Sequence, residues 1–308
     1  MFLVCGEALM DVFSAGDTAT GMTLDARIGG SPFNVALALA RLAQPVAFFG
    51  AVSTGFLGER LMAALAAEGI ATQAVVRTAA PTTLSLVGLD AQGVPAYDFY
   101  GQGTADRQVQ LPDLARLPAP LRAVHLGSYA TVVEPIATTL RELVKSARGT
   151  TLIAYDPNVR LNVEPELQRW QAQLEWMLPR CDLLKISDED LARLRPGQSA
   201  EDFAASALAR GTVAVAVTRG AQGASVWSGR LAVSVPGVPV RVVDTVGAGD
   251  TFQAALLAWL GEHDALQASA LAALGPAQWA AALGFAARAA SITCSRRGAD
   301  VPRRSELD

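Results

Sequence analysis

A glycine-rich turn in the last quarter of the chain carries the residues best suited to chemistry. A strand is expected to end at Asp244, and an apolar helix to begin near Thr251. Between them, Gly247 and Gly249 permit backbone conformations in which consecutive N–H groups point at one spot. A helix N-terminus also favours negative charge, so the turn suits a phosphate in transfer, and Asp250 could accept a proton there. The alternative is that Asp250 only caps the helix, and the turn alone leaves both interpretations open.

The two most familiar nucleotide-binding loops are absent from the sequence. No Gly-x-x-x-x-Gly-Lys-Ser/Thr motif occurs, and the segment GAGDTF has Phe252 where the dinucleotide fingerprint requires glycine. P-loop and Rossmann dehydrogenase functions are therefore disfavoured.

A second candidate region lies near the N-terminus. Ser31 is expected to cap a helix whose first turn contains Asn34. The preceding Gly29 and Gly30 leave room for backbone to touch a ligand. Asn34 could bond the local backbone or hold a ligand hydroxyl. Asp11 follows an apolar strand at its expected carboxyl end, where open α/β sheets bind ligands, although turn capping is the simpler interpretation of this residue alone.

The composition excludes several classes of protein. The chain has 308 residues, of which 51% are hydrophobic and 18% charged, enough for a sizeable core and unlike a disordered protein. A net charge of −4 argues against nucleic acid or an anionic membrane as partner, and the arginine pairs at 296–297 and 303–304 are expected on a solvated face. Three scattered cysteines and two histidines match no metal-site spacing and fit a reducing cytosol.

The sequence predicts a cytoplasmic protein without a membrane span. The longest charge-free run, 265–287, is rich in alanine and broken by Gly275-Pro276, which predicts two short buried helices. The N-terminal segment lacks a positively charged start and contains Glu7 and Asp11, so it is expected to form a strand rather than a signal peptide.

Strands and helices are expected to alternate along most of the chain. Continuous apolar runs predict strands covered on both faces, and the segments between them predict helices. The expected strands are 46–52, 123–127, 151–156, 181–187 and 213–218, and the expected helices are 33–42, 57–68, 134–147, 166–178, 188–194 and 200–210. This alternation predicts a largely parallel sheet in an α/β fold. A hairpin at 225–243 and helices to residue 291 should follow.

Two stretches depart from this alternation. Residues 12–28 and 83–104 mix polar and apolar residues, with turn signals at 15–17 and 91–93. We expect short antiparallel strands outside the main sheet, arranged as a flap over a site.

Taken together, these segments resemble the ribokinase-like (PfkB-type) carbohydrate kinases over essentially the whole chain. GGSPFNVALALARL with GAVSTGFLGERL looks like the N-terminal signature of that family, and DTVGAGDTF looks like its highly specific C-terminal signature. Within the family, GEALMDVF, YDFYGQGTADR, HLGSYA and YDPNVR look most like bacterial fructokinases. The resemblance implies a three-layer α/β/α sandwich with a mostly parallel central sheet, forming one domain over 1–308, with a small β lid from about 12–28 and 83–104.

The resemblance also implies roles for individual residues. Asp250 would be the general base, and the backbone of Gly247, Ala248 and Gly249 would form the anion hole. Arg160, in the segment YDPNVR, would reach towards the transferred phosphate or the sugar. The residues expected to hold the sugar are Asp11, Gly29, Gly30, Asn34 and Asp250.

For the nucleotide, the resemblance implies a site that runs from the phosphate turn to the last long helix. The residues expected there are Lys185, Thr218, Gly220, Gly223, Gly247, Gly249, Ala287 and Ser291. Asp244 and the 291–298 loop resemble the monovalent-cation site of some members, which suggests K⁺.

The family motif Asn-x-x-Glu is altered in this chain. Ser187 and Asp190 stand in its place, so the amide is lost and the carboxylate is one methylene shorter. We expect Mg²⁺ dependence to survive, with Asp190 near the metal. The alternative is that Asp190 is only an acidic residue in the first turn of a helix.

The resemblance implies transfer of the γ-phosphate of ATP to a primary hydroxyl, most directly the conversion of D-fructose to fructose 6-phosphate. The first alternative is a kinase for an acidic sugar such as 2-keto-3-deoxygluconate, for which Arg27 or Arg107 would supply the cation. The second is a non-catalytic sugar-binding homologue. Lid strands in the family that this chain resembles often pair across a dimer, so the resemblance implies a homodimer.

Overall fold

The computed structural model describes residues 1–89 and 95–307. Its largest sheet has eight strands in the order β14-β13-β12-β11-β10-β9-β1-β4, of which β13 and β14 are antiparallel to their neighbours and the others parallel. The strands are β1 (Phe2–Cys5), β4 (Val46–Phe49), β9 (Ala123–Gly127), β10 (Leu152–Asp156), β11 (Leu183–Ser187), β12 (Ala214–Thr218), β13 (Ala224–Ser228) and β14 (Leu231–Val235). The mostly parallel sheet predicted from the sequence is confirmed.

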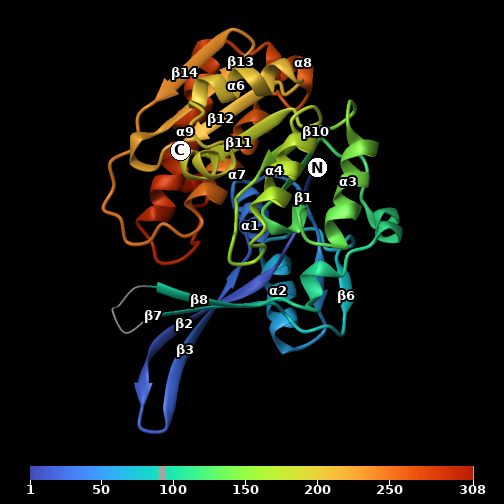
Figure 1. The fold of residues 1–308 in the computed structure, drawn as a ribbon, viewed down its shortest axis with the longest axis vertical. Coiled ribbons are helices and arrows are strands. Elements are labelled where there is room, and N and C mark those ends of the chain that lie inside the picture. Colours follow the sequence, from blue (N-terminus) through green and yellow to red (C-terminus); the bar gives the residue numbers. More distant parts are fainter. Residues whose placement is uncertain (90–94, 308) are drawn as a thin grey trace.

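Helices cover both faces of this sheet (Figure 1). Leu3 and Ile153 point to one apolar cluster and their neighbours Val4 and Leu152 to the other, so the strands are buried on both sides. One layer contains α1 (Ser31–Arg41), α2 (Phe56–Ala67), α7 (Ala248–Glu262), α8 (Ala268–Ala272) and α9 (Pro276–Cys294); the other contains α3 (Ile136–Ala147), α4 (Leu167–Met177), α5 (Asp188–Leu194) and α6 (Ala200–Ala209). The three-layer α/β/α fold is thereby confirmed.

A second sheet of four strands, in the order β3-β2-β7-β8, lies beside this sandwich. Its strands are β2 (Leu9–Thr18), β3 (Gly21–Gly29), β7 (Leu84–Leu89) and β8 (Pro95–Tyr100). The two stretches that broke the alternation in the sequence thus meet in one sheet, and the β2–β3 hairpin projects away from the body (Figure 1). A short parallel pair, β5 (Ala51–Ser53) with β6 (Val76–Thr78), completes the strands in the described part of the chain.

Several local predictions were wrong. The turn expected at 15–17 is a register shift inside β2, between Ser14 and Asp17, and the chain reverses only after Thr18. A β-bulge absorbs the extra residues, and Gly16 tolerates the positive φ of 119° there. The other expected turn, at 91–93, lies outside the described residues.

Boundaries elsewhere also differ from expectation. The 46–52 run is divided between β4 and β5, and the hairpin expected at 225–243 ends at Val235. Residues 236–247 form no strand, because prolines at 236 and 239 cannot donate backbone hydrogen bonds to a sheet. The following helix begins at Ala248, three residues earlier than predicted.

Within residues 1–89 and 95–307, no helix combines the length and the apolar character that crossing a bilayer requires. The alanine-rich run predicted as two short helices contains α8 and the first part of α9.

Two tryptophans on α4 test how this helix packs against the sheet. Trp170 is fully buried, and its indole N–H donates to the carbonyl of Glu164 at 2.9 Å, whereas Trp176 on the same helix lies partly exposed against Arg180. We expect Trp170→Ala to lower the free energy of unfolding by about 3–5 kcal/mol because it leaves a cavity. Trp176→Ala, the control, should cost about 1 kcal/mol. Equal losses in urea denaturation would contradict the described core.

Candidate active site

A cavity of about 1200 Å³ runs across the carboxyl ends of the parallel strands. Its floor is the N-terminus of α7, which begins after Gly247 in the left-handed conformation with φ 77°. A Cβ on Gly247 would lie 2.6 Å from the Cβ of Ala299, so both the conformation and the space require glycine. Ala248 donates its N–H to the carbonyl of Thr245 at 3.2 Å, and Gly249 and Asp250 follow it in the first turn, which lines the cavity and makes it suitable for an anion.

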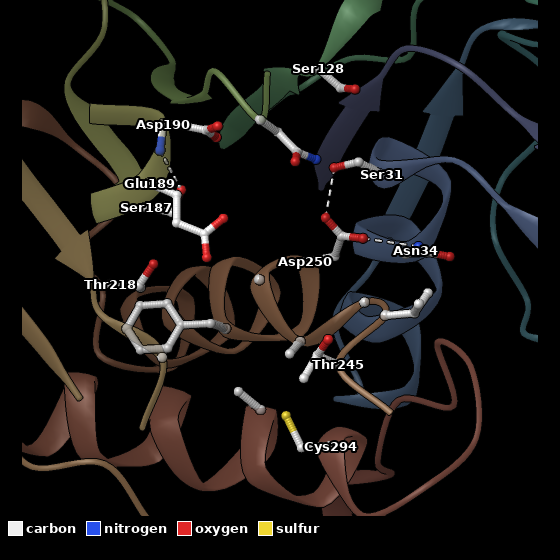
Figure 2. A pocket seen from close by; sticks show the side chains of 18 of the residues that line it. Ser31, Asn34, Ser128, Ser187, Glu189, Asp190, Thr218, Thr245, Asp250 and Cys294 are labelled. Atoms are coloured by element: carbon white, nitrogen blue, oxygen red, sulfur yellow. Dashed lines mark hydrogen bonds between the residues drawn. The ribbon is translucent and has the colours of Figure 1, made fainter. Parts of the chain in front are cut away.

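Asp250 lies in that first turn and is almost fully buried. The hydroxyl of Ser31 donates to its Oδ1 at 2.6 Å, and Nδ2 of Asn34 donates to its Oδ2 at 2.9 Å (Figure 2). These two bonds come from the first turn of α1 and fix the direction of the carboxylate, which still lines the cavity. The site can therefore present an oriented proton acceptor beside an anion-binding helix terminus.

The N-terminal helix is built differently from the sequence prediction. Gly30, not Ser31, is the N-cap, and the Ser31 side chain makes no capping bond. The amide of Asn34, predicted to bond either backbone or a ligand, donates instead to Asp250. Sequence reasoning missed this pairing because the partners are 216 residues apart.

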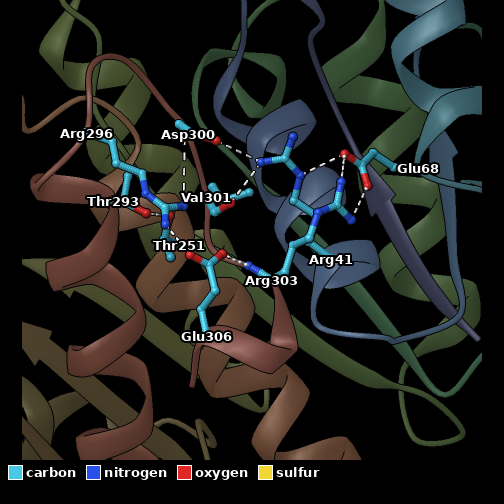
Figure 3. A network of polar contacts seen from close by, with 9 residues as sticks. All are labelled: Arg41, Glu68, Thr251, Thr293, Arg296, Asp300, Val301, Arg303 and Glu306. Carbon is cyan, nitrogen blue, oxygen red and sulfur yellow. Dashed lines mark hydrogen bonds and ion pairs between the residues drawn. The ribbon is translucent and has the colours of Figure 1, made fainter. Parts of the chain in front are cut away.

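Helices α1 and α7, which carry these groups, are linked through a polar network that includes the C-terminal segment (Figure 3). Arg41, at the end of α1, donates to the carbonyl of Val301 at 2.8 Å and pairs with Glu68 at 2.8 Å. On α7, the hydroxyl of Thr251 shares a hydrogen bond of 2.9 Å with that of Thr293. The network joins α1, α2, α7 and α9, so the geometry around the acidic group depends on the C-terminal segment.

The expected sugar-binding residues cluster on the next wall. Asp11 and Gly30 line the cavity, and Gly29 lies behind them, where a Cβ would come within 2.2 Å of the Asp11 carboxylate. Asp11 lies inside β2 rather than directly after a strand of the main sheet, contrary to the prediction. Burial raises the pKa of Asp11, hydrogen bonding from Ser85 and the charge of Arg160 oppose that rise, and Asp250 adds to it.

Arg160 and Lys185 are cationic side chains that line the cavity. Arg160 is exposed, and its Nη1 donates to the carbonyl of Val159 at 3.0 Å. Lys185 is buried and pairs with Asp156 at 2.8 Å, and its Nζ lies 3.1 Å from where a Cβ of Gly249 would be. Burial raises the pKa of Asp156, and Lys185 opposes the rise. The ammonium group thus lies directly beside the proposed anion hole.

The opposite end of the cavity contains the residues expected for the nucleotide. The lining residues there include Thr218, Gly220, Gly223, Ala287 and Ser291. Sequence analysis missed a further part of this wall, an irregular segment whose valines at 238, 240, 242 and 246 line the cavity. The signal was available, because Pro236 and Pro239 in this run of valines disfavour a strand.

The two acids predicted to bind metal are engaged with the protein. Asp190 accepts from the backbone N–H of Val159 at 3.2 Å and from Arg193 at 3.1 Å, and it lines the cavity. Asp244 lies outside this cavity, and its oxygens accept the N–H groups of Val246 at 3.0 Å and Gly298 at 2.8 Å. Among the residues described, no group of three or more His, Cys, Asp or Glu side chains is preassembled for a metal ion.

The chain is similar to known proteins along nearly its whole length. The model of a family described as "pfkB family carbohydrate kinase" matches residues 1–305. A fructokinase of Rhizobium leguminosarum bv. trifolii is 35% identical over 274 residues, 89% of this chain and 84% of the relative. Two solved structures are also similar. A fructokinase from Xylella fastidiosa with bound ATP has a TM-score of 0.86 at 27% identity, covering 99% of this chain and 96% of that one. A fructokinase from Vibrio cholerae O395 in a fructose, ADP and calcium ion bound form has a TM-score of 0.83 at 27% identity, covering 99% and 97%.

The buried ion pair between Lys185 and Asp156 should contribute to the stability of the fold. Lys185→Met should lower the free energy of unfolding by about 3–5 kcal/mol, because it leaves the Asp156 carboxylate buried without its partner. Lys145→Met, which breaks the exposed pair with Glu142, is the matched control and should cost less than about 1 kcal/mol. Adding Asp156→Leu to Lys185→Met should recover part of the loss. Failure of that second change to restore stability in thermal unfolding would contradict the pairing.

Proposed function

The chain belongs to the pfkB family of carbohydrate kinases, and on this premise we propose that it transfers the γ-phosphate of ATP to the 6-hydroxyl of D-fructose. The observation that carries the proposal is the Asp250 carboxylate, oriented by two donors at the N-terminus of α7, in a cavity that extends to both sides of it. The relatives named fructokinase support the choice of sugar.

In the proposed reaction, Asp250 accepts the proton of the sugar alcohol as its oxygen attacks the γ-phosphorus. A new O–P bond forms while the bond from the γ-phosphorus to the β,γ-bridging oxygen breaks, and ADP leaves. The backbone of Gly247, Ala248 and Gly249, at the N-terminus of α7, stabilises the charge on the phosphoryl oxygens, and Lys185 adds a fixed positive charge beside it. The sugar binds against Asp11, Gly30 and Asn34 at one side of the cavity.

Two ions are part of the proposal. Mg²⁺ binds mainly through nucleotide phosphates and water, so it needs only one or two protein carboxylates. Asp190 and the exposed Glu189 line the cavity and fit this role, the ion supplying charge neutralisation on the phosphates (Figure 2). For K⁺, the loop fastened to Asp244 through Gly298 is the proposed site, since it packs directly behind Gly247.

The two lid arginines considered for an acidic sugar do not support that substrate. The sequence offered Arg27 and Arg107 as cations for the carboxylate of 2-keto-3-deoxygluconate. In the described residues neither lines the cavity, and Arg27 pairs with Asp25 at 2.5 Å. We therefore keep the acidic sugar as an alternative that the assay below tests.

The place of action that we propose is the cytoplasm, where ATP is available. The free state of Cys5, Cys181 and Cys294 accords with a reducing compartment.

Loss of the base gives the main test of the function. Asp250→Asn should lower kcat for MgATP and fructose by about 10²–10⁴-fold, because the amide cannot accept the proton. The control is Asp264→Asn. This exposed residue lies two positions after the end of α7, and its substitution should leave kcat unchanged. Phosphate transfer is measured as ADP release.

The same assay separates the alternatives. Faster turnover of 2-keto-3-deoxygluconate than of fructose would overturn the proposed sugar and keep the mechanism. Fructose binding without turnover in the unaltered protein would indicate a non-catalytic homologue.

We further propose that the β2–β3 hairpin pairs two chains into a homodimer. Met22 and Leu24 on β3 are 62% and 49% exposed at the projecting end of the hairpin, where a partner would cover them (Figure 1). Leu24→Glu should shift the protein from dimer to monomer in sedimentation at micromolar concentration. The control Leu111→Glu, at an exposed leucine outside the second sheet, should leave the dimer intact. A monomeric unaltered protein would contradict the proposal.

A further inference from the structure

Glu7 is a buried acid in the cavity wall to which the proposed reaction gives no role. It lies in the short link between β1 of the main sheet and β2 of the second sheet, and only 1% of its surface is exposed. It nevertheless lines the cavity, and its Oε2 has no hydrogen-bond partner. A buried polar atom without a partner costs free energy, so its retention beside a cavity points to a ligand.

The register of the sheet places Glu7 beside another unusual residue. Cys5 on β1 pairs with Leu126 on β9, so residues two positions further along, Glu7 and Ser128, emerge together at the carboxyl edge of the sheet. Ser128 is buried, lines the same cavity and adopts a positive φ of 53°, which is strained for a residue with a side chain (Figure 2). The two side chains thus form one polar corner of the cavity.

This corner is close to the proposed sugar site. The carbonyl of Glu7 packs against Gly30, where a Cβ would come within 2.7 Å of it. Gly30 is the N-cap of α1, whose next residue, Ser31, holds Asp250. Arg160 is the nearby positive charge that acts on both Glu7 and Asp11.

A neighbouring acid shows what a purely structural role looks like. Asp106 is equally buried but does not line the cavity, and it accepts from the hydroxyls of Thr83, of Thr104 at 2.8 Å and of Tyr129 at 2.8 Å. Its hydrogen-bonding capacity is used within the protein, whereas one oxygen of Glu7 is left over.

We propose that the Glu7 carboxyl, supported by Ser128, hydrogen-bonds a hydroxyl of the bound sugar other than the one phosphorylated, and so helps to select the sugar. This inference rests on the proposed function. Burial raises the pKa of Glu7 to about 8 against the opposing effects of Ser128 and Arg160. At pH 7 the group is therefore mostly neutral, and it can donate one hydrogen bond as well as accept one.

The test compares Glu7→Met with Glu7→Gln. Methionine fills a similar volume without polar oxygens, so it should raise KM for fructose at least about fivefold while KM for ATP stays within twofold. Glutamine can still donate and accept, so it should stay within about threefold of the unaltered protein. The melting temperature of Glu7→Met should fall less than that of Asp106→Asn, because one of the two Glu7 oxygens is already unpartnered. Asp106→Asn is the structural control and should lower the melting temperature without a fructose-selective rise in KM.

Monodeoxyfructoses identify the hydroxyl. Removing the contacted hydroxyl should raise KM in the unaltered protein but add nothing further in Glu7→Met, because the same hydrogen bond is already lost. The inference is overturned if Glu7→Met turns over fructose with unchanged KM, or if no deoxy sugar shows this coupling. Absence of turnover on fructose by the unaltered protein would instead overturn the proposed function and the inference built on it.

Discussion

The hydrogen bonds from Ser31 and Asn34 to Asp250 join the two ends of the chain at the point where chemistry is proposed. They require α1 and α7 to pack side by side in one layer over the sheet, which places both helix N-termini at the same cavity. The left-handed Gly247 and the C-terminal segment that holds Arg41 keep this packing in register. The rest of the fold can be understood as the scaffold that brings these two helix ends together.

The polar groups around this centre are arranged along the carboxyl ends of neighbouring parallel strands. Three residues that line the cavity, Glu7, Ser128 and Lys185, lie in or within two residues of β1, β9 and β11, and Asp156, the partner of Lys185, ends β10 between β9 and β11. Parallel strands deliver their ends to one edge, so residues far apart in sequence share a cavity. Different parts of the cavity therefore carry different chemistry. The ammonium group of Lys185 lies beside the N-terminus of α7, and the unpartnered carboxyl oxygen of Glu7 lies beside the proposed sugar site.

Most of the main sheet could be predicted because its strands are apolar on both faces, and β9 and α5 were predicted to the residue. The failures have physical causes. The bulge at Gly16 lies within a strand and was mistaken for a turn. The valines of 236–247 are β-branched, but this segment pairs with no strand. The candidate residues were found through glycine turns and family motifs. Their partners were not, because the bonds of Asp250 and the free oxygen of Glu7 depend on contacts that no local pattern records.

The proposed reaction requires the oriented Asp250 carboxylate to contact the reacting alcohol of the sugar. A crystal structure with fructose and a non-hydrolysable ATP analogue tests it most directly, through the distance between O6 of fructose and the nearer Asp250 oxygen. For a proton acceptor in position, we expect about 2.6–3.2 Å, with O6 facing the γ-phosphorus in line with the bond to be broken. A fructose bound with O6 turned away from Asp250, or with another side chain in hydrogen-bonding reach of that hydroxyl in its place, would contradict it.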